Sequence, residues 1–229
     1  MSKVMKQRLQ QLLQRIAIAC EQAQREPQSV RLLPVSKTFS HELVQQAIML
    51  GLTRFGENRI QDIRSRYEHF AGQPVQWVMI GHAQTNKARD IARYADELQS
   101  LDRLALAEAL QRRLDGEQRC LPVYIQVKTA QEDSKFGLDP SQLMPFLAQL
   151  KHFDRLQPQG LMTMATQTDD TKEIRRCFAQ LRLLRDQAQE AGYENITRLS
   201  MGMSGDFELA IAEGATDIRV GSALFGHRA

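Results

Sequence analysis

A lysine near the start of the chain is the first residue whose position suggests chemistry. Lys37 stands two residues after an apolar segment at 31–35, in the run Leu-Leu-Pro-Val-Ser-Lys-Thr. Apolar neighbours remove water from an ammonium group, and this desolvation lowers the pKa of a lysine and makes its amine a better nucleophile. A solvent-facing loop lysine is the alternative, and this residue alone does not choose between the two.

Two segments near the C-terminus, each with glycine and serine, suggest a phosphate site. The first is SMGMSGD at 200–206, which leads into a helical pattern, and the second is IRVGS at 218–222. Glycine lets the backbone approach a ligand closely, and a helix N-terminus offers unpaired N–H donors and a favourable dipole. The simpler interpretations are that Ser204 caps the helix and that Gly221 marks a turn.

The elements that must position these residues alternate along the chain. Apolar spacing such as that of Leu43, Ala47 and Leu50 indicates helices between short apolar strands. This alternation requires parallel pairing, and the pattern fits a closed barrel better than an open doubly wound sheet. We therefore predict an α/β fold, a single (β/α)8 TIM-type barrel with an extra N-terminal helix. Strands are expected at 31–35, 53–55, 76–80, 97–101, 121–127, 157–162, 196–201 and 218–221, and helices at 3–25, 41–50, 58–69, 84–94, 103–115, 140–151, 171–191 and 204–213.

A barrel of this kind gives the three segments a common location. Its active sites lie at the C-terminal ends of the strands, and the loops after strands seven and eight commonly bind phosphate. Lys37 follows the first predicted strand, and the glycine segments follow the seventh and eighth. An amine and a phosphate site at one barrel mouth suit a phosphorylated aldehyde, and pyridoxal 5′-phosphate (PLP) is a cofactor of that type.

Arg219 adds a constraint on the chemistry of such a cofactor. It has the same strand parity as Gly221, which would point its side chain toward a bound ring. Arginine only donates hydrogen bonds, so it would face an unprotonated pyridine nitrogen and weaken PLP as an electron sink. The alternative is an ion pair between Arg219 and a carboxylate such as Asp217 or Glu213.

The composition is that of an ordinary globular protein. Of 229 residues, 42% are hydrophobic and 25% are charged, which argues against disorder. A net charge of +3 is too weak to indicate nucleic acid or a membrane surface, and no apolar run approaches the ~18 residues of a spanning helix. We expect one domain over residues 1–229. Three distant cysteines without an export signal predict a reduced, cytoplasmic protein, and the five histidines lack metal-binding spacing.

Short motifs spread from about residue 31 to 227 occur in an order typical of one family. They are Pro34-Val35-Ser36-Lys37-Thr38, Phe55-Gly56-Glu57-Asn58, Ile80-Gly81-His82 with Gln84-Thr85-Asn86-Lys87, Ser134-Lys135-Phe136-Gly137, Gly160-Leu161-Met162, the segment 199–204 with Asp206, and Arg219-Val220-Gly221-Ser222 with Phe225-Gly226. In these motifs the chain resembles the pyridoxal phosphate homeostasis proteins, single-barrel relatives of the N-terminal domain of alanine racemase. The two C-terminal motifs are the most specific part of the resemblance.

The resemblance implies which residues bind the cofactor. Lys37 would hold PLP as an imine (Schiff base), and Arg219 would face the pyridine nitrogen. Asn58 matches a cofactor-binding motif, although no contact is assigned to it. The phosphate cradle would consist of Ser200, Met203, Ser204, Gly221 and Ser222.

Other residues near the matched stretches have open roles. Lys87, Lys128 and Lys135 are rivals of Lys37 for the imine, and Lys128 stands where the family usually has an asparagine after the fifth strand. His82 follows the third strand and either lines the site or is an ordinary loop histidine. Asn86 matches a motif position without an assigned contact.

Three functions fit these residues. The first is a PLP carrier and regulator of vitamin B6 homeostasis without robust catalysis, which would pass the cofactor to PLP-dependent apoenzymes. The second is a PLP-dependent racemase or decarboxylase of amino acids, and the third is a barrel enzyme that acts on a sugar phosphate. Barrel racemases, as the family relationship implies, take one proton donor from a second domain and a partner subunit. The single domain expected over residues 1–229 would lack that donor. We therefore favour the carrier, and we expect a monomer without catalytic residues.

Overall fold

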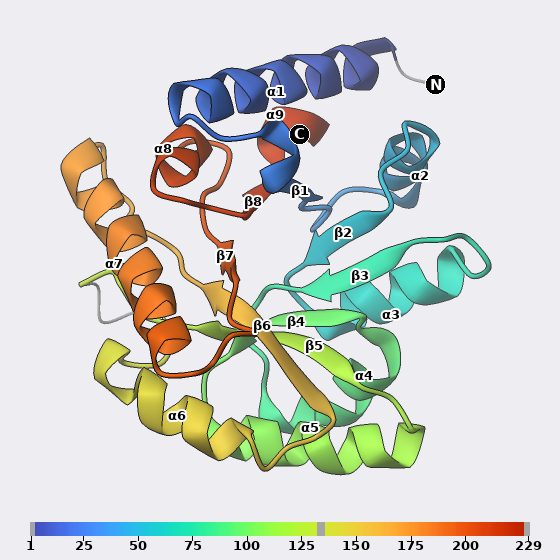
Figure 1. Cartoon of the computed structure of the whole chain (residues 1–229). Helices are drawn as coiled ribbons and strands as arrows, with labels where there is room; N and C mark the ends of the chain where they lie inside the picture. The colour runs from blue at the N-terminus through green and yellow to red at the C-terminus, as the bar shows by residue number, and fades with distance from the viewer. Residues whose placement is uncertain (1–2, 132–135, 227–229) are drawn as a thin grey trace.

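The structure, a computed structural model, describes residues 3–131 and 136–226. Eight parallel strands form one sheet in the order β1-β8-β7-β6-β5-β4-β3-β2. A parallel bridge between Val35 and Gly56 joins the two edges, so the sheet closes into a barrel with helices outside it (Figure 1). The predicted (β/α)8 barrel is confirmed. Its strands are β1 (Arg31–Pro34), β2 (Arg54–Glu57), β3 (Gln76–Met79), β4 (Glu97–Leu101), β5 (Leu121–Gln126), β6 (Leu156–Met162), β7 (Arg198–Ser200) and β8 (Asp217–Val220).

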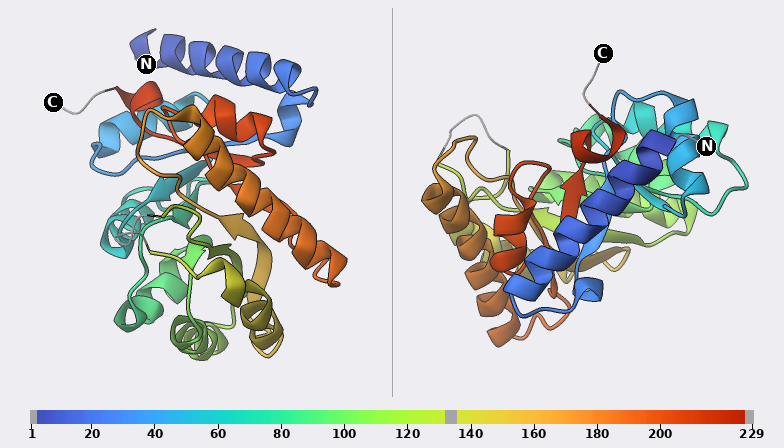
Figure 2. Two further views of the ribbon diagram at one scale, coloured as in Figure 1. Left: turned by 90° about the vertical axis from the view of Figure 1, so that its left-hand side faces the viewer. Right: turned by 90° about the horizontal axis from the view of Figure 1, so that it is seen from above.

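Helices surround the barrel and connect its strands. An additional helix, α1, precedes the barrel and packs on α8 and α9, as both views of Figure 2 show. In residues 3–131 and 136–226, none of the helices has the length and apolar character needed to cross a membrane. The α-helices are α1 (Lys3–Gln22), α2 (His41–Met49), α3 (Ile60–His69), α4 (Ala88–Tyr94), α5 (Leu104–Glu117), α6 (Leu143–Leu150), α7 (Thr171–Glu190), α8 (Phe207–Ala212) and α9 (Ser222–Phe225), and the 3-10 helices are η1 (Pro27–Ser29), η2 (Thr85–Lys87) and η3 (Pro140–Gln142).

The predicted elements differ from the observed ones mainly at their ends. The helix expected at 204–213 begins only at Phe207, with Asp206 at the N-cap position. Residues 204–206 form a turn in which the Asp206 carboxylate accepts a hydrogen bond from the Met203 amide across 2.6 Å. The strand expected at 196–201 is confined to Arg198–Ser200. The helix α9 was not predicted, since four residues are too few for a helical periodicity.

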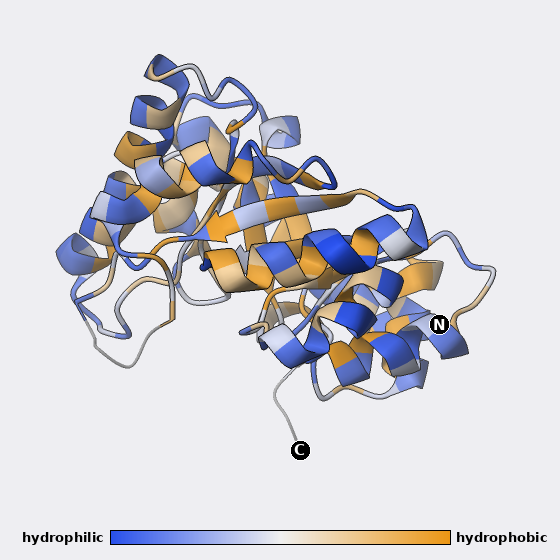
Figure 3. Ribbon diagram, turned by 90° about the horizontal axis from the view of Figure 1, so that it is seen from below, coloured by the Kyte–Doolittle hydropathy of each residue, from blue (hydrophilic) through white to orange (hydrophobic). Residues whose placement is uncertain are grey.

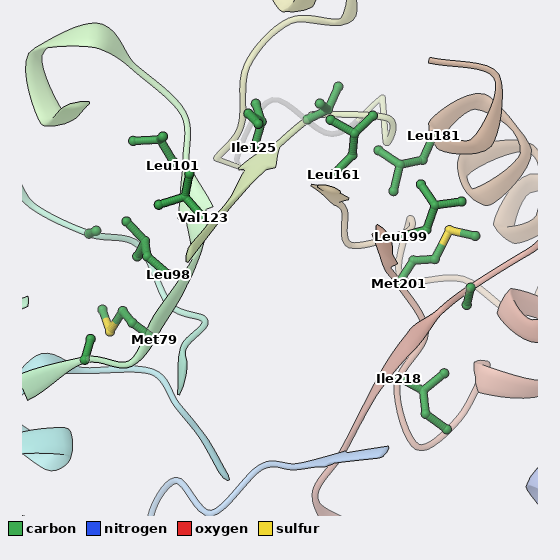
Figure 4. Close-up of a cluster of buried hydrophobic side chains, with 14 of the residues drawn as sticks. Met79, Leu98, Leu101, Val123, Ile125, Leu161, Leu181, Leu199, Met201 and Ile218 are labelled. Carbon is green, nitrogen blue, oxygen red and sulfur yellow. The ribbon is translucent and has the colours of Figure 1, made fainter. Parts of the chain in front are cut away.

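Apolar side chains fill the layer between the strands and the helices. Leu98, Val123, Ile125 and Leu199 of the strands form a buried cluster with Leu181 of α7 (Figure 4). The helices are apolar on one side only, and Figure 3 shows hydrophilic and hydrophobic residues alternating around them. The core therefore lies outside the barrel strands, and it fixes the strand ends from which the mouth loops emerge.

The barrel interior, in contrast, contains a network of charged and polar side chains. Arg54 binds Glu97 at 2.6 Å and Asp217 at 3.2 Å. Asp217 also binds Arg31 at 2.8 Å and accepts a hydrogen bond of 3.2 Å from the Tyr124 hydroxyl. Each of these five side chains comes from a different strand, namely β1, β2, β4, β5 or β8, and projects inward. Because Arg31, Arg54, Glu97 and Asp217 are the first residues of their strands, the network closes the barrel at the end opposite the mouth.

Candidate functional site

A cavity of about 730 Å³ opens at the C-terminal ends of the strands. Its lining comes mainly from the loops after β1, β2, β3, β5, β7 and β8 and from the ends of β5, β6 and β8. The cavity contains seven of the eight residues predicted to bind the cofactor: Lys37, Asn58, Met203, Ser204, Arg219, Gly221 and Ser222. Segments far apart in the sequence therefore meet at one barrel mouth.

Lys37 occupies a tight turn directly after β1. The turn runs from Ser36 to Phe39, and the Phe39 amide donates to the Ser36 carbonyl oxygen across 3.1 Å. Lys37 is half-buried and lines the cavity. The rivals Lys87 and Lys128 are not among the residues that line the cavity in the described part of the chain, whereas Lys135 and its neighbour Ser134 lie outside the described residues.

The loop after β7 brings backbone groups to the cavity. The cavity is lined here by Met203, Ser204 and Gly205. The Asp206 carboxylate accepts a hydrogen bond from the Met203 amide. Within residues 3–131 and 136–226, the amides of Ser204 and Gly205 donate to no backbone acceptor. These two N–H groups are therefore available to an anion. Ser204 does not cap α8, because Asp206 occupies that position.

Gly202 makes this loop possible. Its φ is +91°, and a side chain there would place its Cβ 2.5 Å from the Cβ of Ala210 in α8. Glycine alone accepts both the left-handed conformation and this close approach. Next to this loop, Gly221 and Ser222 lead from β8 into α9, and β8 lies between β7 and β1 in the sheet. Lys37 and the two serine loops are therefore neighbours around the barrel.

Arg219 lies at the base of the cavity and is almost fully buried, with 4% of its surface exposed. Its Nη1 donates to Ser200 Oγ and its Nη2 to the Thr163 carbonyl oxygen, each across 2.8 Å. Burial lowers the pKa of Arg219 to about 10, so the guanidinium remains protonated at neutral pH. The alternative of an ion pair with Asp217 or Glu213 is wrong, because these carboxylates bind other arginines.

Ser200, the eighth predicted residue, lies behind Arg219 and is not among the residues lining the cavity in the described part of the chain. It is fully buried, accepts the hydrogen bond from Arg219, and donates its own hydroxyl to Gln99 Oε1 across 2.6 Å. Gln99 Nε2 in turn donates to Glu97 Oε1 across 2.7 Å. This chain of hydrogen bonds connects Arg219 with the charged network at the other end of the barrel.

One wall of the cavity consists of residues to which the sequence analysis assigned no contact, although it left His82 open as a residue of the site. The His82 and Phe136 rings stack with centroids 3.8 Å apart, and Gln126 Nε2 donates to the Phe136 carbonyl oxygen across 3.0 Å. His82 therefore lines the site, with its Nδ1 3.8 Å from Asp102 Oδ2. Strand parity indicates Gln126, which is two residues after the inward-facing Tyr124, whereas Phe136 belongs to a matched motif to which no role was assigned. Ile80, Met162 and Met164 complete this wall.

The groups of the cavity fit PLP in chemical type and in size. Lys37 offers an amine for an aldehyde, the loops after β7 and β8 offer N–H and hydroxyl groups for a phosphate, and Arg219 offers a donor for a ring nitrogen. A volume of about 730 Å³ falls within the range of about 300–1,000 Å³ that is usual for small-molecule sites. Among the described residues, no group of three or more His, Cys, Asp or Glu side chains could hold a metal ion.

Known proteins are similar to this chain in sequence and in fold. Residues 8–229 match the family described as alanine racemase, N-terminal domain. A pyridoxal phosphate homeostasis protein from Aquifex aeolicus (strain VF5) is 36% identical over 222 residues, which cover 97% of this chain and 97% of that protein.

Two solved structures are similar over nearly the whole chain. A protein of Bifidobacterium adolescentis, described as unknown, has a TM-score of 0.91 and 34% identity, with 98% of this chain and 97% of that chain covered. PipY of Synechococcus elongatus PCC7942, solved with PLP bound, has a TM-score of 0.82 and 36% identity, with 93% and 99% covered.

The fold and the family match define the class: the barrel is that of the alanine racemase N-terminal domain. The identity of 36% over nearly the full length of both chains identifies one family within this class. The chain belongs to the family of pyridoxal phosphate homeostasis proteins. The resemblance of its motifs to that family is confirmed.

Proposed function

We propose that this chain binds PLP as a Schiff base on Lys37 and takes part in intracellular PLP homeostasis as a carrier and regulator without robust catalytic activity. The observation that carries the proposal is the meeting of an amine, two serine loops and a buried arginine in one cavity of about 730 Å³. The PLP-bound structure of PipY, which is 36% identical, supports the same cofactor.

Each residue of the cavity has a proposed part. Lys37 would form the imine with the aldehyde, with loss of water. Ser204 and Ser222 would hold the phosphate together with the free amides of Ser204 and Gly205, and Met203 and Gly221 would line this cradle. Arg219 faces the ring nitrogen, and Asn58 contacts the cofactor from the loop after β2. Ser200 acts behind them, since its hydroxyl fixes the Arg219 guanidinium.

Arg219 determines what the bound group can do. When bound, PLP supplies an aldehyde for an amine and a ring able to accept electrons. A guanidinium that donates to Ser200 and Thr163 from the barrel interior has only further donors to offer the ring. It therefore leaves the ring nitrogen unprotonated, which disfavours the proton transfers of a racemase or decarboxylase and suits retention of the cofactor.

We also propose that PLP-dependent apoenzymes receive the cofactor at the barrel mouth. Phe136 and Met203 line the cavity and are 54% and 40% exposed, so a second protein can contact both side chains at the mouth. A recipient docked there would meet the cofactor directly. The chain acts as a monomer in this proposal, and its cytoplasmic location remains a prediction.

Absorbance spectroscopy tests the cofactor. Addition of PLP to the apoprotein is expected to give a visible imine band that borohydride bleaches, because reduction converts the imine to an amine. Glyceraldehyde 3-phosphate serves as the competing phosphorylated aldehyde. If it is bound and trapped while PLP is not, the chain is a sugar-phosphate protein.

A transfer assay tests the carrier role. The PLP-loaded protein is mixed with a PLP-dependent apoenzyme in the presence of a phosphatase that destroys free PLP. Activation of the apoenzyme is expected to exceed that from the same amount of free PLP. Equal activation would mean that the protein only releases PLP into solution.

A further inference from the structure

A buried ion pair lies behind the loop that carries Lys37. Glu57 ends β2 with a parity opposite to that of Arg54 and Asn58, so its side chain faces α3 instead of the barrel axis. It is fully buried, and Arg66 of α3 is 5% exposed. Arg66 Nε donates to Glu57 Oε1 across 3.2 Å. The pair is outside the cofactor cavity, but it touches the turn that enters it.

The ion pair contacts both ends of that turn. Ser36 Oγ donates to Glu57 Oε1 across 2.7 Å. Arg66 Nη2 donates to the Ser36 carbonyl oxygen across 3.2 Å and also to the Phe39 carbonyl oxygen. One guanidinium therefore joins the first and the last residue of a four-residue turn whose second residue is Lys37.

The conformation of the turn needs such support. Thr38, its third residue, has a φ of +69°, in the left-handed region that a β-branched residue enters only at a cost in free energy. Such a conformation persists where the surroundings fix it, and it is common at ligand sites. The Phe39 ring also stacks on the Phe225 ring of α9, with centroids 4.8 Å apart, which connects the turn to the loop after β8.

Burial of an ion pair removes two charges from water at a cost in free energy, and an apolar pair of similar volume often gives the protein the same stability. We propose that Glu57 and Arg66 are positioning residues, which hold the turn from Ser36 to Phe39 so that the Lys37 amine meets the cofactor aldehyde. This inference rests on the proposed function. It predicts that loss of the pair impairs imine formation while the phosphate and ring contacts remain.

Two ligands separate these effects. PLP reports on imine formation through its visible band and through borohydride trapping, whereas pyridoxine 5′-phosphate has no aldehyde and reports only on the rest of the cavity. The variants are Arg66→Met, Arg66→Lys and Ser36→Ala. The matched control is Glu68→Gln, which removes an exposed ion pair between Arg64 and Glu68 on the same helix, at 2.9 Å.

The equilibrium constant for imine formation is expected to fall at least about tenfold in Arg66→Met, because the turn loses two charge-assisted hydrogen bonds, to the Ser36 and Phe39 carbonyl oxygens. A smaller decrease is expected in Ser36→Ala. Arg66→Lys keeps the charge but has a single nitrogen for three acceptors, so its value should lie between those of Arg66→Met and the wild type. Affinity for pyridoxine 5′-phosphate should stay within about twofold in every variant, as it should for the surface change Glu68→Gln.

Equal losses for both ligands would show a merely structural role and overturn the inference. So would imine formation in all variants that matches the Glu68→Gln control. If Arg66→Met does not fold, Ser36→Ala and Arg66→Lys decide the question by the same comparison. Absence of an imine in the wild type overturns the proposed function itself, whereas a wild-type imine that the variants leave unchanged overturns only the positioning role.

Discussion

The change Ser200→Ala removes a hydroxyl that joins two buried side chains. Arg219 loses the acceptor for its Nη1, and Gln99 loses the donor for its Oε1. Both side chains are buried, so water cannot replace the lost partner. The nearby Ser204 provides the matched control, because its hydroxyl has no hydrogen bond to the described residues and it lines the cavity.

The expected magnitude follows from these contacts. A buried polar group left without a partner costs about 1–3 kcal/mol, and two such groups remain after Ser200→Ala, so the free energy of unfolding should fall by about 3 kcal/mol. Ser204→Ala breaks no hydrogen bond and should change it by less than about 0.5 kcal/mol. The two variants should also differ in their affinity for PLP. Ser204→Ala should lose affinity directly, because its hydroxyl faces the cavity, whereas Ser200→Ala should lose affinity only if Arg219 is displaced.

Urea unfolding of the apoprotein measures the stability change, with the single tryptophan, Trp77, as the fluorescent probe, since it is 2% exposed. The cofactor is left out because a ligand of the folded state would add its binding energy. An unchanged slope with denaturant supports a pure stability effect. If Ser200→Ala loses less than about 1 kcal/mol and its PLP affinity falls as in Ser204→Ala, Ser200 contacts the phosphate and the reasoning fails.

Three further predictions concern the cavity, the chemistry and the folding unit. Gly221→Val should weaken PLP binding at least ~10-fold in a fluorescence titration. The barrel should stay folded, because a Cβ at Gly221 lies at an ordinary contact distance of 3.4 Å from the Val35 carbonyl oxygen. Unchanged affinity would remove Gly221 from the cradle. The loaded protein should not racemise alanine, serine or ornithine during prolonged incubation, and chiral chromatography that gives a rate within about two decades of ~10 per second would contradict the carrier role. The apoprotein should sediment as a 26.1 kDa monomer and unfold in one thermal transition, so a dimer or two separate transitions would count against a monomeric single domain.

The fold could be predicted because several strands of this barrel have a strong local signal. The apolar segments at 31–35 and 121–127 are short, and amphipathic helical patterns separate the predicted strands. The ends of the elements depend on individual hydrogen bonds instead. In the turn before α8 the Met203 amide donates to the Asp206 carboxylate, and a sequence pattern does not show that Asp206, and not Ser204, stands at the N-cap position.

The site was predictable where a residue lies at a strand end, and it was not where contacts cross the barrel. Lys37 and Gly221 follow β1 and β8, so barrel geometry alone places them at the mouth. Ser200 and Ser204 look equivalent in the sequence, yet one faces the interior and the other the cavity. The ion pairs of Arg54 join strands that are far apart in the chain, so the periodicity of a single segment does not predict them.

The central claim is that Lys37 carries the cofactor. Wild-type protein is loaded with PLP, reduced with borohydride, digested and analysed by peptide mass spectrometry, with Lys37→Ala and Lys128→Ala treated in parallel. The pyridoxyl group is expected on the peptide that contains Ser36-Lys37-Thr38, and the visible band should disappear only in Lys37→Ala. A Lys37→Ala protein that keeps the full imine band, with the label on the peptide of Lys128, would contradict the assignment.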